Sequence, residues 1–395
     1  MRKIFEWLGV QAENRGLLVT INLSFFFSGL MMVMLGAILP FIRSDYALSY
    51  TQTGLIFSFH QVGNLTAVLA AGVLPYWIGR KRSTLLLSAG ATLGLTLAIV
   101  AGHPLLLMVA FAFTGIGRGT FSNICNAVNT EISSNKTAAL NVLHSGYALG
   151  ALISPMVVFA YVSVMGSPGW RFAVATVAFF MAVAWLLILR SELPPIPPKK
   201  EKGGSFTFLK HKSFWIPTML LFFYLAVEVS IVGWFVVYFL DIGVLPPVLS
   251  GFVPTFHWSM VMVGRLFIAS ISLRVKNKNM MLVIMAFAAL FSFTGLMLSA
   301  TAVSSVIFLV LLGLSLAGVY PTTIASMTGE NSAVSIGFTI AIATFGGILM
   351  PSIIGVLADV RGISEAIALV LVVLIVVTAL AVVKIFTERQ AYRQH

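Results

Sequence analysis

Apolar residues run along the chain in long blocks, which short polar or charged stretches interrupt. A helix needs about 20 apolar residues to cross the roughly 30 Å hydrocarbon core of a bilayer. Backbone groups in lipid must satisfy one another, so blocks of this length are predicted to be α-helices. Twelve such blocks are predicted, at residues 17–42, 52–76, 83–102, 104–130, 138–165, 170–189, 214–240, 249–273, 280–300, 303–328, 332–358 and 363–386.

The longest polar connection, residues 191–213, separates six predicted spans from the other six. Its sequence, "SELPPIPPKKEKGGSFTFLKHKS", is rich in proline, lysine and glycine, which is typical of a flexible linker. Basic "GRKRS" follows the second span and basic "LRVKNKN" follows the eighth, so the two halves repeat. We therefore predict an N-terminal half at 1–190, the linker, and a C-terminal half at 214–395, in the parallel-repeat architecture of many secondary transporters.

The composition agrees with a membrane protein, and the charge distribution orients it. Hydrophobic residues make up 59% of the 395 positions and charged residues only 9%, too apolar for a soluble domain. With both termini cytoplasmic, nineteen lysines and arginines fall inside and three outside, as the positive-inside rule requires. This rule accounts for the net charge of +12 without nucleic-acid binding. We expect a monomer in the cell membrane, without a cleavable signal peptide.

One loop carries a family signature. The stretch "GVLPYWIGRKRSTLL" between the second and third spans supplies Gly72, Gly79, Arg80 and Lys81, with Tyr76 where an acid is usual. It resembles the glycine- and arginine-rich loop of the major facilitator superfamily. The resemblance implies an all-α membrane protein with twelve transmembrane helices in two parallel six-helix repeats. It also implies that Gly79 and Arg80 belong to a gate, and that helices one, four, seven and ten line a central cavity.

Further stretches resemble the fucose–proton symporter branch and its sugar-transporter relatives. They include "GIGRGTFSNICNAVN" on helix four, "ALNVLHSGYALGALISP" on helix five and "YLAVEVSIVGWFVVYFL" on helix seven. The resemblance covers essentially the whole chain and implies uptake of a sugar or polyol. Members of this branch often carry an acid where Ser122 stands, and helix one has no charge here. Proton coupling must therefore be argued from the residues that are present.

Three charges lie deep in predicted spans: Arg118 on helix four, Glu228 on helix seven and Arg265 on helix eight. Each costs about 2.5–3.5 kcal/mol at a helix centre on insertion scales, so each is a candidate functional residue. Arg118 and Glu228 share a depth, and we expect them to face each other across the pathway. Glu228 then binds substrate or takes up a proton; the alternative is a static ion pair that fixes packing. Arg265 is expected to gate or pack the inner side.

Other polar and aromatic residues complete the candidate site. Arg118, Ser122, Asn126 and Asn129 recur at helical spacing and form one stripe, which suits a hydroxyl-rich ligand. Polar contacts between neighbouring helices are the alternative reading. His60 on helix two and His144 on helix five are further candidate proton carriers, although structural histidines are commoner. The other candidates are Asn64 on helix two, Asn141 and His144 on helix five, His257 and Trp258 on helix eight, and Tyr320 on helix ten.

These features favour a secondary transporter over other classes of protein. An intramembrane enzyme would need paired acids, a metal-ligand set or a nucleophile–base constellation, and none is apparent in the spacing. No Gly-x-x-x-x-Gly-Lys-Ser/Thr motif indicates an ATP-driven pump. We expect no cofactor and no metal. The predicted function is alternating-access transport of a small polar solute, a sugar or polyol, coupled to protons; the alternative is proton-driven export of drugs or metabolites.

Overall fold

Most of the described residues lie in helices, and the described part of the chain contains no β-strand. A computed structural model describes residues 2–196, 206–272, 277–327 and 333–393. The chain divides into two compact units, one of residues 1–48 and 55–199, the other of 49–54 and 200–395. The predicted linker at 191–213 lies partly outside the described residues, and its boundaries stay a prediction.

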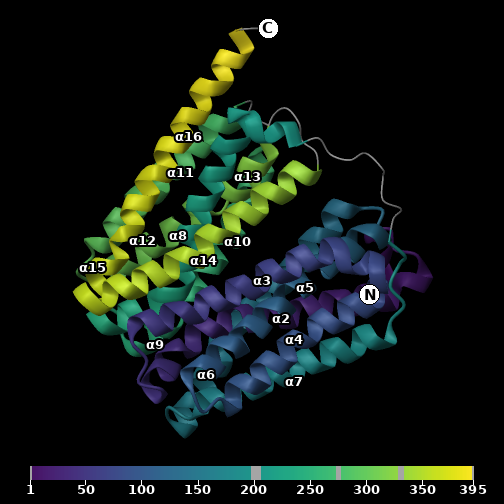
Figure 1. The fold of residues 1–395 in the computed structure, drawn as a ribbon, viewed down its shortest axis with the longest axis horizontal. Coiled ribbons are helices and arrows are strands. Elements are labelled where there is room, and N and C mark those ends of the chain that lie inside the picture. The colour runs from purple at the N-terminus through teal and green to yellow at the C-terminus, as the bar shows by residue number, and fades with distance from the viewer. Residues whose placement is uncertain (1, 197–205, 273–276, 328–332, 394–395) are drawn as a thin grey trace. The chain divides into compact units, whose positions relative to one another are not determined.

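The first unit consists of long helices that follow the first six predicted spans (Figure 1). After a short N-terminal helix, α2 contacts α5, α6 and α7, while α4 contacts α5 and α7. The helices are α1 (Arg2–Leu8), α2 (Arg15–Asp45), α3 (Tyr50–Ile78), α4 (Arg80–Val100), α5 (Pro104–Ile132), α6 (Lys136–Met165) and α7 (Gly169–Arg190). Helices α2 to α7 match the first six predicted spans to within three residues at each end, and most extend beyond the apolar block; α4 ends two residues before its span does.

Close approach of α2 and α6 depends on two glycines. A Cβ on Gly29 would lie 2.1 Å from the Tyr147 carbonyl oxygen, and one on Gly150 would lie 2.1 Å from the Phe26 carbonyl oxygen. No side chain fits at these distances. Gly146 differs, because its nearest neighbour, the Asn22 carbonyl oxygen, would be 3.9 Å away. Small residues thus let the two backbones meet, as is common between membrane helices.

The second unit is built around α8, which packs against α14, α16, α10 and α13. Its largest fully buried side chains include Trp234, Tyr224, Phe235 and Phe239, all on α8. The helices are α8 (Lys212–Ile242), α9 (Pro247–Gly251), α10 (Val253–Ser272), α11 (Lys278–Met297), α12 (Ala302–Leu316), α13 (Val319–Ala325), α14 (Ala333–Arg361), α15 (Ile363–Ile367) and α16 (Leu369–Arg393).

The tenth predicted span, 303–328, is not one helix. It is divided at Ala317 and Gly318 into α12 and α13. Pro321 gives the physical reason, because proline has no N–H to donate to the carbonyl four residues earlier and its ring clashes with that carbonyl. The carbonyl concerned is that of Ala317. The eighth and twelfth predicted spans likewise begin with short helices, α9 and α15.

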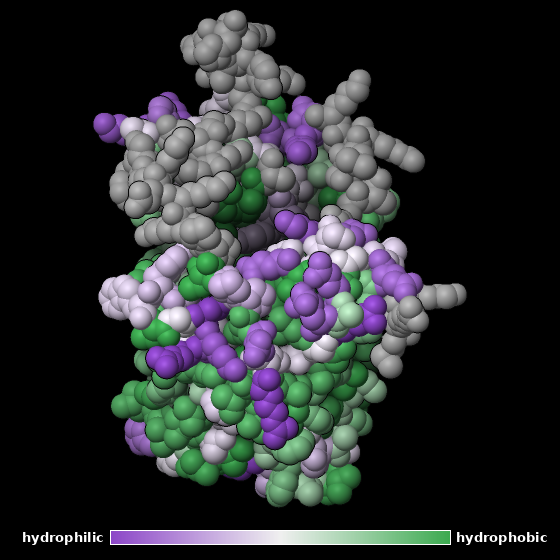
Figure 2. Space-filling model, turned by 90° about the vertical axis from the view of Figure 1, so that its right-hand side faces the viewer, coloured by the Kyte–Doolittle hydropathy of each residue, from purple (hydrophilic) through white to green (hydrophobic). Residues whose placement is uncertain are grey.

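The surface of the described residues suits a bilayer. Among the described residues, eleven helical segments, with α12 and α13 counted as one, are long and apolar enough to cross a membrane. Large apolar side chains are exposed along them, including Trp77 at 78%, Val164 at 81% and Val360 at 77%. Figure 2 shows hydrophilic residues gathered on the side where the N-terminal end lies, and hydrophobic residues over the flanks of the first unit. The eighth predicted span, 249–273, is not among the eleven, and its end lies outside the described residues.

Candidate substrate and coupling site

In the first unit, an amide and an imidazole join α5 to α6. His144 Nε2 lies 3.0 Å from Asn126 Oδ1, and Asn126 Nδ2 donates to the Ser122 carbonyl oxygen at 2.7 Å. Asn126 is half-buried and His144 is exposed. The pair therefore presents hydrogen-bonding atoms at the surface of the helix bundle, where a polar ligand can reach them.

Aromatic rings flank this pair. The Phe25 ring of α2 lies edge-on to His144, with centroids 5.3 Å apart, and tilted against Tyr147, with centroids 4.8 Å apart. Phe25 is buried and Tyr147 half-buried. Ligand sites are typically lined by such aromatic rings together with a few precisely placed polar groups. A sugar, which has apolar ring faces and a polar edge of hydroxyls, suits such a lining.

Arg118 lies at the middle of α5 and is half-buried. Within the described part of the first unit, no carboxylate is within ion-pair distance of its guanidinium. The charge of Arg118 acts on His60 of α3, whose Nδ1 lies 2.9 Å from Thr114 Oγ1. Asn64 stands one turn further along α3 and is half-buried. The first unit therefore offers an unneutralised cation at mid-span, beside polar groups of α3.

The predicted polar stripe on α5 has a buried part, Asn129, and a half-buried part, which includes Ser122 and Asn126. Asn129 is fully buried, and its Nδ2 donates to the Ala139 carbonyl oxygen of α6 at 2.8 Å, so it serves helix packing. Ser122 is half-buried and contributes its carbonyl to Asn126. Asn141 on α6 is exposed, and its carbonyl accepts from Ser145 Oγ at 2.7 Å.

In the second unit, Glu228 and Tyr224 form a hydrogen-bonded pair on α8. The residues stand one turn apart, and the Tyr224 hydroxyl donates to Glu228 Oε1 at 2.9 Å. The same hydroxyl lies 3.3 Å from the Leu316 carbonyl oxygen at the end of α12. The Tyr320 ring of α13 is 6.2 Å from that of Tyr224, centroid to centroid. Glu228 is half-buried at the middle of its helix, which is where an acid is costly in a membrane.

Arg265 belongs to this group through its charge and its hydrogen bond. Its Nε donates to the Ala317 carbonyl oxygen at 3.4 Å. Both Arg265 and Glu228 act electrostatically on the hydroxyls of Tyr224 and Tyr320. Arg265 thus serves the break between α12 and α13; its expected role in gating stays a prediction.

His257 and Trp258 on α10 are placed differently. His257 is 1% exposed, and neither of its ring nitrogens has a hydrogen-bond partner among the described residues. The Trp258 Nε1 likewise has none among them. In this structure His257 does not present a face for a sugar ring to stack on. Stacking by these two residues stays a prediction.

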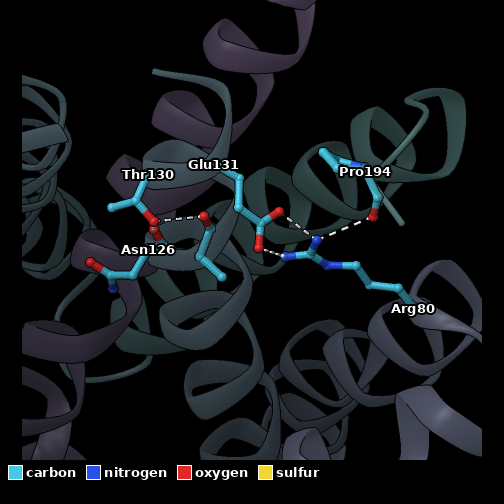
Figure 3. A network of polar contacts seen from close by, with 6 residues as sticks. Arg80, Asn126, Thr130, Glu131 and Pro194 are labelled. Atoms are coloured by element: carbon cyan, nitrogen blue, oxygen red, sulfur yellow. Dashed lines mark hydrogen bonds and ion pairs between the residues drawn. The ribbon is translucent and has the colours of Figure 1, made fainter. Parts of the chain in front are cut away.

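The predicted gate residues stand at one end of the first unit. Gly79 has φ +84°, a conformation that favours glycine, and forms the N-cap of α4. Arg80 donates to Glu131 through Nη1 at 2.6 Å and Nη2 at 3.0 Å, and through Nη1 to the Pro194 carbonyl oxygen at 3.1 Å (Figure 3). The arginine thereby ties the start of α4 to the end of α5 and to the segment that follows α7.

Several partners in these clusters were not predicted. Tyr224 precedes Glu228 by four residues, a spacing that places two side chains together on a helix, so the signal was present. Tyr147 likewise follows His144 by three. In contrast, Glu131 is 51 residues from Arg80 and Phe25 more than 100 residues from His144, and no local spacing connects them.

Comparison with known proteins agrees with this architecture. Residues 21–335 match the sequence profile of the Major Facilitator Superfamily. A hexuronate transporter of Bacillus subtilis is 25% identical over 380 residues, which cover 87% of this chain and 88% of the relative. A glucose/galactose transporter of Brucella abortus is 28% identical over 396 residues, with 90% of each chain covered.

A solved structure shows the same fold. The fucose:proton symporter FucP of E. coli superposes with a TM-score of 0.64 at 16% identity, covering 93% of this chain and 98% of its own. The twelve predicted spans are consistent with this fold. The chain therefore belongs to the major facilitator superfamily, and it is a multi-pass membrane transporter of small solutes rather than an enzyme.

Proposed function

We propose that the chain takes up a sugar or a related polyol across the cell membrane by alternating access, with a proton as the coupling ion. The observation that carries the proposal is Glu228, a half-buried carboxylate at the middle of α8 that is held by the Tyr224 hydroxyl. An ionisable residue within a span is retained for a function by default.

The choice of substrate is supported by the first unit. Asn126 and His144 present amide and imidazole atoms beside Phe25 and Tyr147. A sugar ring matches this combination of hydrogen-bonding and aromatic surfaces. The relatives that transport a hexuronate and glucose or galactose belong to the same substrate class.

Glu228 is proposed to combine binding and coupling. As a carboxylate it accepts hydrogen bonds only, from Tyr224 and from a substrate hydroxyl. When protonated it loses its charge, so its preference between conformations changes; a group that interacts differently with two states shifts the equilibrium between them. Asp45 and Asp359 stand near helix ends, so Glu228 is the carboxylate we assign to this task.

A second candidate substrate is a sugar acid. Arg118 supports it, because this mid-span cation has no carboxylate partner within the described part of the first unit. A hexuronate would bring the missing charge, and arginine binds carboxylates in bidentate geometry.

Counterflow in proteoliposomes tests the proposal. Vesicles are loaded with unlabelled D-glucose, D-galactose, L-fucose or D-glucuronate, and uptake of the same labelled sugar is measured against protein-free vesicles. We expect exchange of at least one of these sugars. Exchange of D-glucuronate that Arg118→Gln abolishes would select the sugar acid. The same assay is run with a labelled amphiphilic drug, and exchange of the drug without exchange of any sugar would contradict the proposal and favour export of drugs.

A further inference from the structure

The break in the tenth span leaves carbonyl groups that side chains of other helices satisfy. Pro321 has no N–H for the Ala317 carbonyl, which accepts from Arg265 Nε at 3.4 Å instead. The preceding carbonyl, of Leu316, is 3.3 Å from the Tyr224 hydroxyl. Backbone groups freed within a membrane are commonly satisfied by neighbouring helices in this way.

Tyr224 has two acceptors and one hydrogen to donate. Glu228 Oε1 lies 2.9 Å from its hydroxyl and the Leu316 carbonyl oxygen 3.3 Å. A phenol donates a single O–H, so it cannot serve both acceptors fully at once. The shorter distance is to Glu228, which agrees with a carboxylate being the stronger acceptor.

We propose that Tyr224 is a positioning residue that transmits the charge of Glu228 to the break between α12 and α13. This inference rests on the proposed role of Glu228. While Glu228 is a carboxylate, it takes the Tyr224 hydrogen, and the Leu316 carbonyl is held weakly. Once Glu228 has bound a proton from solution, its own O–H donates to the Tyr224 oxygen. The Tyr224 hydrogen then turns to Leu316 and fixes the end of α12.

Few titratable or charged residues lie on the described helices that pack against α8. The titratable or charged residues of α10 are Arg265 and His257, and the titratable residue of α13 is Tyr320. On α14 and α15, charged side chains within the described residues stand near helix ends; these are Asp359, Arg361 and Glu365. Lys384 lies inside α16, is 4% exposed and donates to the Ser326 carbonyl oxygen at 3.0 Å.

The test is the accessibility of the break, measured without substrate. Val319, the first residue of α13, is 1% exposed, and Cys125 is the one cysteine of the chain. In full-length Cys125→Ala, Val319→Cys protein in proteoliposomes, the rate of N-ethylmaleimide labelling reports how often α13 opens. Glu228→Gln removes the charge, so we expect labelling to slow by about two- to tenfold, the range that corresponds to one net hydrogen bond.

Matched variants separate the relay from a general effect of the substitution. With Tyr224→Phe present, Glu228→Gln should leave the labelling rate unchanged. With Tyr320→Phe, which removes a hydroxyl from the neighbouring ring, the slowing should persist. The same slowing in the Tyr224→Phe protein, or none in the protein with Tyr224, overturns the proposal.

A second measurement covers the case in which Tyr224→Phe does not fold. 3-Fluorotyrosine at position 224 keeps the hydroxyl, and its fluorine resonance should move on Glu228→Gln; an unmoved resonance overturns the relay. Neither measurement uses a sugar. If no sugar is exchanged but Glu228→Gln still slows the labelling of Val319→Cys, the result counts against the proposed function. If sugar is exchanged but Glu228→Gln does not change the labelling, the result counts against the relay.

Discussion

Arg80 holds Glu131 with two nitrogens, Nη1 at 2.6 Å from Oε2 and Nη2 at 3.0 Å from Oε1. The side chains are 11% and 30% exposed. Arg80→Lys keeps the charge but loses the planar fork. We expect the free energy of unfolding to fall by about 1–3 kcal/mol, as when a partly buried polar group loses its partner. Thermal melting in detergent measures this. The exposed neighbour Arg82→Ala is the control, and equal melting of Arg80→Lys and the unchanged protein would refute the assigned role.

The contact between α2 and α6 predicts that two glycine-to-alanine substitutions change the free energy of unfolding in opposite directions. Gly29→Ala would place a Cβ 2.1 Å from the Tyr147 carbonyl oxygen, so we expect a loss of about 1–3 kcal/mol from overpacking. Gly146→Ala meets its nearest atom at 3.9 Å and should be neutral or stabilising by up to about 1 kcal/mol, since glycine weakens a helix. Melting curves of the two variants decide, and equal effects would show that the helices do not meet as described.

The pair of Asn126 and His144 predicts a change in affinity without a change in fold. His144→Phe keeps a ring beside Phe25 but removes the nitrogen 3.0 Å from Asn126 Oδ1. For the sugar that counterflow identifies, we expect KM to rise about tenfold, the equivalent of one hydrogen bond. Ser145→Ala, an exposed neighbour, should leave KM unchanged. An unaltered KM for His144→Phe would remove the pair from the binding site.

The orientation of the chain is a further prediction. Nineteen basic residues on one side against three on the other place both termini in the cytoplasm. A fluorescent or phosphatase reporter fused after Gln394 should report a cytoplasmic position. The linker prediction concerns residues 196–205, most of which lie outside the described residues. We expect protease to cut within this segment. A reporter that is found outside the cell would contradict the predicted topology.

The sequence predicted the fold because its strongest signal is local. Apolar blocks of about 20 residues specify membrane helices, and the helices of the first unit contain their predicted spans within a few residues. The break at Gly318 was missed although Pro321 was visible, since a proline can kink a membrane helix without dividing it. Glu228 and Arg118 stood out because isolated charges are rare in spans.

What the sequence could not supply was the partner of each polar residue. Arg80 finds Glu131 at a distance of 51 residues, and Tyr224 reaches the Leu316 carbonyl at a distance of 92. Such pairs depend on how helices pack, which spacing along one helix does not encode. The predicted juxtaposition of Arg118 and Glu228 spans the two units and stays a prediction, as do the roles of the other site residues.

The variant Glu228→Gln tests most directly whether Glu228 couples transport to protons. The variant keeps the shape of the side chain and mimics its protonated form. In proteoliposomes loaded with the transported sugar, we expect exchange to continue while accumulation driven by a pH gradient is lost. Glu365→Gln, an acid 64% exposed at a helix end, should keep both. Full accumulation by Glu228→Gln would contradict the account, and loss of exchange as well would assign Glu228 to substrate binding alone.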